Sequence, residues 1–391
     1  MDMSVPVTPK SGSQVASNPK AGIGHNHSDL DVWMQKVDAL GELKTISAEV
    51  DPDLETATIS YLVGSEKSPA LLFENLRGDG SGARVLSNML GSSRERYALA
   101  VGMDPQCTEP IHAKFRVAGS HAGPGGIFTL ASSAIDIALW DIKGKAAGKP
   151  VSELLGGFRK TVPTYASGAL MRSFPLKHVV KAAETLVKKG YTQMKTQLAL
   201  PGDTNPPKEV ERIRLIREAI GDKIDLMCDI NQRWDVRQAI SIGKQVERYH
   251  LFWLEDVVAH DDYPSLARVT AALDTPVAGG EYVYGSVPFR HMMEARSVDI
   301  IMIDLMRSCG ITGFMKIAGM AEAFNLPVVS HLIPEIQVHT IAAIPNGLTV
   351  EYMPWTFRCY KEVPVPKNGM LTVPNKPGLG LEFDPKVVKF K

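Results

Sequence analysis

The feature that most constrains the fold is an alternation, from Thr161 onward, of short apolar runs with amphipathic helical stretches. Eight apolar runs follow one another at intervals of about 25 residues. They occupy residues 161–168, 193–200, 225–232, 251–257, 276–282, 299–306, 327–333 and 348–355. Strands that alternate with helices form parallel sheets, and eight such strands can close into a barrel without exposed edges. The sequence therefore predicts an α/β protein built on a closed TIM-type barrel.

The chain before the barrel changes character twice. Residues 1–30 are polar and rich in Ser, Pro and Gly, so we expect a flexible tail. Residues 31–106 contain two strand-like runs and predict a separate small α+β unit. Residues 107–160 contain a long helical pattern over 128–148, which should end at Gly148 because glycine is favoured just past a helix.

The last two predicted segments are the barrel itself, residues 161–355, and a C-terminal piece, residues 356–391. The C-terminal piece is rich in Gly and Pro and carries short strand signals. We expect it to run back across the mouth of the barrel toward the helical segment.

Composition excludes several classes of protein. Hydrophobic residues make up 44% of the chain and charged residues 22%, the balance of a globular domain. The 43 basic and 43 acidic residues give a formal net charge of +0, which argues against nucleic-acid and polybasic membrane partners. No apolar run reaches the length of a membrane span or of a signal-peptide core.

The cysteines indicate the compartment. Cys107, Cys228, Cys309 and Cys359 are scattered and contain no CxxC pair. Such a pattern offers no disulfide framework, so we expect a reducing, cytoplasmic location.

Three carboxylates stand at the ends of consecutive predicted strands. Asp229, Glu255 and Glu281 are spaced 26 residues apart, and the carboxyl ends of barrel strands meet at the same face. One such acid alone would more often cap a helix or pair with an arginine. Three at the same phase of the repeat favour a shared hard cation such as Mg²⁺, which prefers oxygen ligands.

The next two strands end in Asp304 and His331. A carboxylate on one strand can orient an imidazole on the next and raise its pKa, as in a general acid/base pair. A buried structural histidine is the alternative. The position across from the predicted cation favours catalysis.

Two further charged residues leave their roles open. Glu351, on the last strand, could hold the substrate, donate a hydrogen bond or form a salt bridge within the barrel. Lys195, on the second strand, could neutralise a substrate carboxylate, act as a base, or simply be solvated.

The order and spacing of several motifs resemble the enolase superfamily, in its mandelate racemase-like branch of acid-sugar dehydratases. The resemblance covers residues 110–391, and its motifs are "ASSAIDIALWDIKGKAAGKPVSELLGG", "CDINQRW", "WLEDV", "GGEYVYG", "IDLMRSCGITG" and "VVSHLIPEIQVH". It implies a (β/α)7β TIM-type barrel, with residues 107–160 as a partial helical capping segment to which the C-terminal piece returns. Assembly as a homo-oligomer is expected from this analogy alone.

The resemblance also implies a chemistry. Mg²⁺ would be held by Asp229, Glu255 and Glu281, and the α-proton of a small carboxylate substrate would be removed to give an enediolate. The site residues that it implies or leaves as candidates are His331, Asp304, Lys195 and Glu351 for catalysis, and Gln197, Asn231 and Arg307 for substrate binding.

One departure from the family selects among its reactions. The racemases of the branch that this chain resembles carry a Lys-x-Lys motif on the second strand. At the matching positions this chain has Lys195, Thr196 and Gln197. A glutamine cannot abstract a proton, so the expected reaction is dehydration of a sugar acid to a 2-keto-3-deoxy acid with His331 as the single base. Racemisation or epimerisation of an α-substituted carboxylate is the alternative.

A second departure concerns the N-terminal segment. Residues 31–106 resemble the opening part of the UbiD-like, prenylated-flavin-dependent decarboxylases rather than the usual cap of the enolase superfamily. A catalytically impaired fusion that keeps only the barrel therefore stays open. A non-oxidative decarboxylase is the least favoured reading, because no counterpart of the flavin-binding part is present.

Overall fold

The computed structural model describes residues 30–63, 68–89, 93, 95–96, 103–121, 123, 125–200 and 205–387. Apart from Leu30, the predicted flexible tail lies outside these residues. Within them, no helix combines the length and the apolar character that crossing a bilayer would require.

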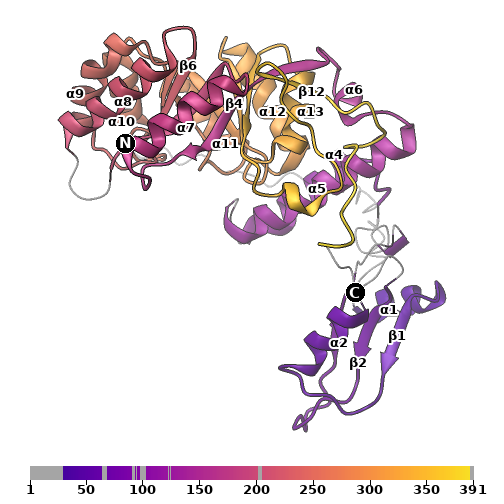
Figure 1. Cartoon of the computed structure of the whole chain (residues 1–391). Helices are drawn as coiled ribbons and strands as arrows, with labels where there is room; N and C mark the ends of the chain where they lie inside the picture. The colour runs from indigo at the N-terminus through magenta and orange to yellow at the C-terminus, as the bar shows by residue number, and fades with distance from the viewer. Residues whose placement is uncertain are drawn as a thin grey trace, which may run out of the picture.

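Eight parallel strands close into a barrel, as predicted (Figure 1). They are β4 (Thr161–Leu170), β5 (Gln193–Gln197), β6 (Asp225–Asp229), β7 (Trp253–Glu255), β8 (Val277–Gly279), β9 (Ile300–Asp304), β10 (Val328–His331) and β11 (Gly347–Tyr352). Closure is made by β11 and β4, which pair in parallel with Glu351 opposite Tyr165.

Among the described residues, seven α-helices lie between these strands and cover the barrel, which gives the (β/α)7β order. They are α7 (Leu176–Lys188), α8 (Pro206–Ile220), α9 (Val236–Val246), α10 (Tyr263–Ala272), α11 (Ser286–Glu294), α12 (Gly310–Ala323) and α13 (Pro334–Ala343). Several begin at polar caps; Asp235, for example, forms a reciprocal capping box with Gln238 at the start of α9.

Apolar side chains fill both sides of the barrel wall. One core lies between strands and helices, and a second lies inside the cylinder, where Tyr165 packs edge-on against Trp253. Burial of this interior leaves the carboxyl ends of the strands as the place where polar side chains gather.

The capping segment is helical, as predicted. It contains α4 (Thr108–Ala118), α5 (Gly126–Ala147) and α6 (Val151–Leu154). Helix α5 ends at Gly148, whose φ of 66° is a left-handed conformation that glycine adopts without strain. Asp136 and Trp140 of α5 both bond the side chain of Thr312, which fixes α5 on α12 of the barrel.

The C-terminal piece corrects one expectation. Its strand β12 (Met370–Thr372) does not cross the barrel mouth but pairs antiparallel with Thr161–Pro163 at the opposite end of β4. Those first residues of β4 extend beyond the pairing with β11, so their backbone groups need another partner. The chain then reaches the capping helices, where Gly378 pairs with Pro150.

The N-terminal unit is a small α+β structure, as predicted. It consists of α1 (Leu30–Ala39), β1 (Leu43–Ile46), α2 (Glu55–Val63), β2 (Ala70–Phe73) and β3 (Val85–Ser87). The strands form a sheet in the order β1-β2-β3, with β1 and β2 parallel and β2 and β3 antiparallel. Alternate residues of β2 enter two separate cores, one with Trp33 and one with Val50.

Candidate active site

The carboxyl ends of the barrel strands surround a cavity of about 260 Å³. The polar residues predicted from the sequence that line it are Lys195, Gln197, Asp229, Asn231, Glu281, Arg307, His331 and Glu351. Strand register explains their convergence: Asp229 lies opposite Glu255 on the next strand, and His331 lies opposite Asp304. The structure thus brings the predicted site residues to one end of the barrel.

The tightest group of carboxylates contains two predicted ligands and one residue that the sequence analysis missed. Among the described residues, Glu255, Asp256 and Glu281 each offer an oxygen within 4.8 Å of the others, and all three are buried. Two neighbours in a strand normally point to opposite faces. Asp256 escapes this rule because its φ of 47° turns the chain as β7 ends; the tandem "ED" in "WLEDV" was the only signal.

Asp229 lies just outside this group. It is buried, it lines the cavity with Glu281, and its Oδ1 accepts a hydrogen bond of 2.8 Å from the backbone N–H of Asn231. Neither Glu255 nor Asp256 lines the cavity. Asp229 and Glu281 are therefore the predicted ligands that could touch both a cation and a molecule in the cavity.

The donor set fits a hard divalent cation. Burial raises the pKa of Glu255 and that of Asp256 well above their usual range, and burial with the charge of Asp256 raises the pKa of Glu281 to about 7. Asp256 Oδ2 is buried and accepts no hydrogen bond from the described residues. Crowded carboxylates with an unused acceptor would be stabilised by an ion that takes oxygen ligands.

Lys195 is fixed by two carboxylates. Its Nζ lies 2.5 Å from Glu255 Oε1 and 3.0 Å from Glu351 Oε1, and the side chain is only 5% exposed. Burial disfavours the ammonium, but Glu255 and then Glu351 outweigh it and raise the pKa of Lys195 well above its ordinary value. A lysine whose ammonium form is stabilised by two carboxylates is a poor base, so the structure favours an electrostatic role.

Glu351 is held as a carboxylate. Burial alone would raise its pKa, but Lys195, His331 and the N–H of Leu332 lower it to about 2. Leu332 N donates to Glu351 Oε2 at 2.7 Å. An ionised carboxylate cannot donate a hydrogen bond, so of the three roles left open the salt bridge within the barrel is the one with direct support.

His331 and Asp304 form the expected pair. His331 Nδ1 lies 2.6 Å from Asp304 Oδ2, and Nε2 lies 3.3 Å from Glu281 Oε2. Burial opposes the imidazolium, yet the charge of Glu281 and the hydrogen bond to Asp304 raise the pKa of His331 to about 9. Asp304 is itself positioned by the N–H groups of Met306 and Arg307. The imidazole therefore presents Nε2 toward the carboxylate cluster.

The predicted substrate-binding residues form the rim of the cavity. Gln197 Nε2 donates to Asn231 Oδ1 at 3.4 Å, and Arg307 Nη1 donates to the Glu281 carbonyl and to Asp304 Oδ2. Arg172, which the sequence analysis missed, donates to Asn231 Oδ1 at 2.6 Å. Its position just past β4 carried no motif, so no signal was available from the sequence.

Two residues that line the cavity were also missed. Tyr282 follows Glu281 directly, and its hydroxyl lies 3.5 Å from Asn231 Nδ2. Trp355 stands at the mouth with 64% of its side chain exposed. Both stand at the ends of predicted strands, residues 276–282 and 348–355, but neither has a residue type that predicts a ligand.

Three family models match the chain. The model described as "Enolase C-terminal domain-like" matches residues 178–387, and that of the mandelate racemase / muconate lactonizing enzyme N-terminal domain matches residues 88–156. The N-terminal domain of 3-octaprenyl-4-hydroxybenzoate carboxy-lyase matches residues 34–109. The last two matches overlap between residues 88 and 109, where the two resemblances meet.

Curated relatives include several sugar-acid enzymes. L-talarate/galactarate dehydratase of Salmonella typhimurium is 32% identical over 280 residues, which cover 72% of this chain and 70% of the relative. 3,6-Anhydro-alpha-L-galactonate cycloisomerase of Streptomyces coelicolor is 31% identical, with 73% and 78% covered. Arabinonate dehydratase of Saccharolobus solfataricus is 30% identical, with 71% and 76% covered.

Solved structures of sugar-acid dehydratases are also similar to this chain. L-talarate dehydratase from Polaromonas sp., complexed with Mg and L-glucarate, superposes with a TM-score of 0.70 at 29% identity and covers 79% of this chain and 88% of its own. L-talarate/galactarate dehydratase from Salmonella typhimurium, liganded with Mg and L-lyxarohydroxamate, gives a TM-score of 0.70 at 29% identity, with 78% of each chain covered. With the barrel order and the family models, these similarities show that the chain belongs to the enolase superfamily, in the branch of mandelate racemase and muconate lactonizing enzyme.

Proposed function

We propose that this chain is a Mg²⁺-dependent hydro-lyase that converts a sugar acid to a 2-keto-3-deoxy acid. The observation that carries the proposal is the placement of His331, held by Asp304, with Nε2 directed at the carboxylate cluster. The relatives named as dehydratases, and the neighbours crystallised with Mg, support the same class of reaction.

The cation would be held by Asp229, Glu255 and Glu281, with Asp256 as a fourth carboxylate beside them. When bound, it would supply positive charge next to the substrate carboxylate and so acidify the proton on the adjacent carbon. The protonated Lys195 adds a second positive charge at the same end of the barrel. Gln197, Asn231 and Arg307 would orient the hydroxyl groups of the substrate.

His331 would perform both proton transfers. Its neutral Nε2 would take the proton from C2 of the substrate, and the resulting imidazolium would protonate the hydroxyl at C3, which leaves as water. The remaining enol becomes the 2-keto-3-deoxy acid by tautomerisation, so no redox partner is needed. Neutralisation of Glu281 by a cation would lower the pKa of His331, which that carboxylate helps to raise.

Racemisation has less support because it needs a second base on the opposite face of the substrate. Lys195 is tied to Glu255 and Glu351, and Gln197 does not titrate. The decarboxylase reading has support only from the family match over residues 34–109.

The test is a panel of sugar acids with and without Mg²⁺, scored for 2-keto acid formation. The panel should include galactarate, talarate, arabinonate and xylonate, which are named among the substrates of the relatives. We expect at least one member to react only with Mg²⁺, and recovered substrate to keep its configuration at C2. Absence of turnover with intact Mg²⁺ binding would favour the impaired fusion, and inversion at C2 would favour the racemase.

A further inference from the structure

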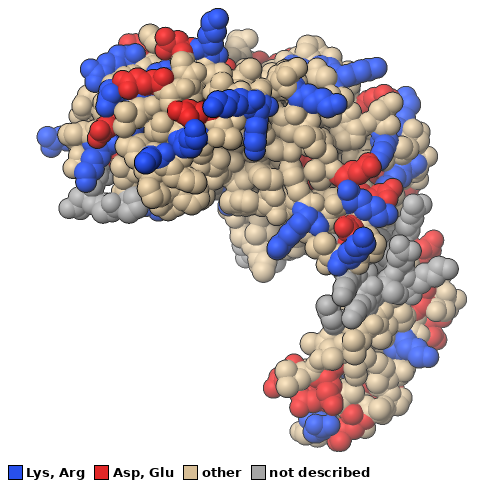
Figure 2. All heavy atoms as spheres, in the orientation of Figure 1, with Lys and Arg blue, Asp and Glu red and all other residues tan. Residues whose placement is uncertain are grey.

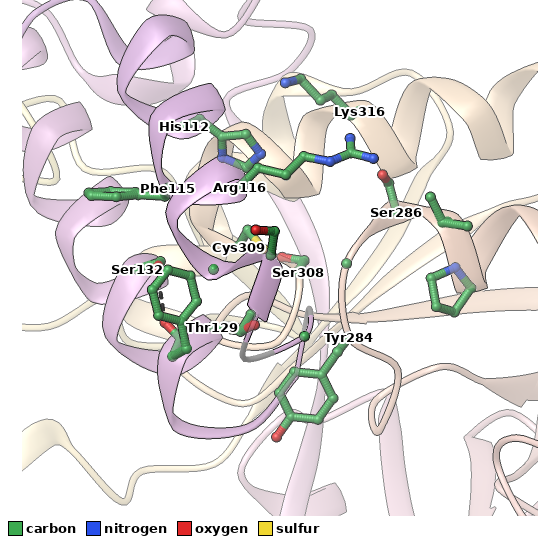
Figure 3. Close-up of a pocket in the computed structure, with 18 residues that line it drawn as sticks. His112, Phe115, Arg116, Thr129, Ser132, Tyr284, Ser286, Ser308, Cys309 and Lys316 are labelled. Carbon is green, nitrogen blue, oxygen red and sulfur yellow. Dashed lines mark hydrogen bonds between the residues drawn. The ribbon is translucent and has the colours of Figure 1, made fainter.

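A second cavity lies outside the barrel mouth, between the capping helices α4 and α5 and the barrel helices α11 and α12 (Figure 3). Its volume is about 430 Å³, against 260 Å³ for the candidate active site. That size suits a small molecule. No residue assigned to the proposed reaction lines it.

The walls of this cavity are largely apolar. Its apolar lining includes Phe115 of α4, Phe128 of α5, and Tyr284 and Pro288. Phe128 is packed so closely over Gly119 that any side chain at Gly119 would collide with its ring. The cavity therefore offers fixed aromatic surfaces on which a planar or aliphatic body can pack.

The basic side chains that line the cavity lie on one side of it (Figure 3). Arg116 and His112 from α4 and Lys316 from α12 all line it. Lys316 is paired with Glu109 at 2.7 Å, whereas Arg116 has no ion pair among the residues that the structure describes. Burial, and then the positive charge of Lys316, lower the pKa of His112. None of the described residues that line the cavity is acidic; Glu109, the partner of Lys316, is not a lining residue.

Ser286 adds a hydroxyl to this polar side of the cavity. It is the first residue of α11, and Figure 3 draws its hydroxyl on the same side of the cavity as the Arg116 guanidinium. The preceding Gly285 provides no side-chain cap, so the first N–H groups of α11 have no capping acceptor there. A guanidinium and a hydroxyl beside apolar walls match one charged end and one apolar end of the same ligand.

We propose that this cavity is a binding site for a small amphipathic carboxylate. Its apolar body would pack against Phe115, Phe128 and Tyr284, and its carboxylate would meet Arg116 and Ser286. The proposal is independent of the reaction proposed for the barrel.

The two cavities are close neighbours, so a test must tell them apart. Gly285 N donates to the Arg307 carbonyl at 3.0 Å, and the Arg307 guanidinium lies 6.0 Å from the centre of the Tyr284 ring. Arg307 also reaches Asp304 of the candidate active site. A carboxylate probe must therefore be shown to depend on α4 rather than on the barrel mouth.

The experiment is a calorimetric titration of the full chain with 2-naphthoate, in excess EDTA so that no metal can hold the probe in the barrel. We expect one equivalent to bind with a dissociation constant of about 1 mM or lower. The neutral 2-naphthalenemethanol should bind at least tenfold more weakly. Arg116→Glu should weaken naphthoate at least tenfold, whereas Arg237→Glu, an equal change of charge on exposed α9, should leave it within twofold.

A second variant tests the apolar wall. Phe115→Asp should also weaken naphthoate at least tenfold, with Phe115→Ala as the substitute if thermal melts show that Phe115→Asp is unfolded. The proposal is overturned if no saturable binding occurs, if the alcohol binds as tightly as the acid, or if Arg116→Glu binds like the wild type. Sensitivity to Arg116→Glu without sensitivity at Phe115 would indicate ion pairing on the surface and would also overturn it.

Discussion

Charged side chains are used differently at the barrel mouth and in the N-terminal unit. Lys195, Glu255 and Glu351 are almost fully buried, with nitrogen–oxygen distances of 2.5 and 3.0 Å. Arg77 of the N-terminal unit is 54% exposed, and its pairs with Asp51 and Glu55 measure 3.8 and 3.5 Å. Figure 2 shows mainly acidic side chains on the visible surface of that unit, with a few basic ones among them.

Buried and exposed charges differ in what they cost the folded protein in free energy. Taking ions out of water costs several kcal/mol each, so a buried cluster is a poor way to gain stability. Exposed pairs cost little and contribute little. The buried charges of the barrel are therefore best explained by chemistry, whereas the exposed pairs of Arg77 contribute little. The N-terminal unit does bury one charge, Arg96, which is 1% exposed and paired with Glu42 at 2.9 Å.

The largest expected effect is on stability when the buried cluster loses its lysine. Lys195→Met leaves Glu255 and Glu351 buried without their cation, so the free energy of unfolding in EDTA should fall by about 3–5 kcal/mol. Urea denaturation measures it. The exposed Lys177→Met on α7 is the control and should change stability by less than about 0.5 kcal/mol. A loss below about 1 kcal/mol for Lys195→Met would contradict the claim that the buried carboxylates depend on the charge of Lys195.

A buried neutral group should give the next largest effect. His339 Nδ1 accepts the Ser152 N–H, Nε2 lies 3.0 Å from the Leu379 carbonyl, and burial lowers the pKa of His339 to about 4. Between pH 6.5 and 4 the histidine of the unfolded chain binds a proton that the folded chain does not. The free energy of unfolding should therefore decrease as the pH is lowered through that window.

The variant His339→Gln isolates this contribution. It removes the titrating group, so the difference in unfolding free energy between wild type and variant should shrink by about 3 kcal/mol from pH 7 to pH 4. Urea midpoints across that range measure the difference. A difference that stays constant with pH would show that His339 titrates normally.

The next prediction concerns how strongly two carboxylates at the barrel mouth contribute to Mg²⁺ binding. Asp229→Asn should reduce Mg²⁺ affinity most, because Asp229 lines the cavity, and Asp256→Asn should reduce it by about tenfold as a neighbouring carboxylate. Calorimetric Mg²⁺ titrations of both variants measure this. If Asp256→Asn has the larger effect, Asp256 replaces Asp229 in the ligand set.

The smallest effect on stability is expected from the exposed ion pairs of the N-terminal unit. Arg77→Ala should change the free energy of unfolding by less than about 1 kcal/mol, and less still at high salt, because its partners are solvated. Turnover should be unchanged. A salt-independent loss above 2 kcal/mol would show that this surface network is structural.

Much of the fold was predictable because one periodicity repeats along the chain. All eight strands and the end of α5 at Gly148 lie where the sequence places them. The return of the C-terminal piece to the capping helices was predicted, as the pairing of Gly378 with Pro150 shows. The position of β12 was not, because its pairing depends on which backbone groups of β4 are left unpaired, and that is a tertiary property.

Site residues at the regularly spaced strand ends could be predicted from the sequence, and those at other positions could not. Asp304 and His331 pair because parallel register places strand ends side by side. Asp256 was missed because its left-handed φ breaks the alternation of the strand. The ion pairs of Lys195 were left open because sequence spacing does not report which side chains fill a barrel interior.

The most direct test of the central claim is exchange of the α-proton of a turned-over sugar acid in ²H₂O with Mg²⁺. The His331→Asn variant should lose exchange by about 10³-fold or more, since it removes the imidazole whose Nε2 faces the cluster. Its Mg²⁺ affinity should stay within a few-fold of that of the wild type. Near-normal exchange in this variant, with Mg²⁺ bound, would contradict the account.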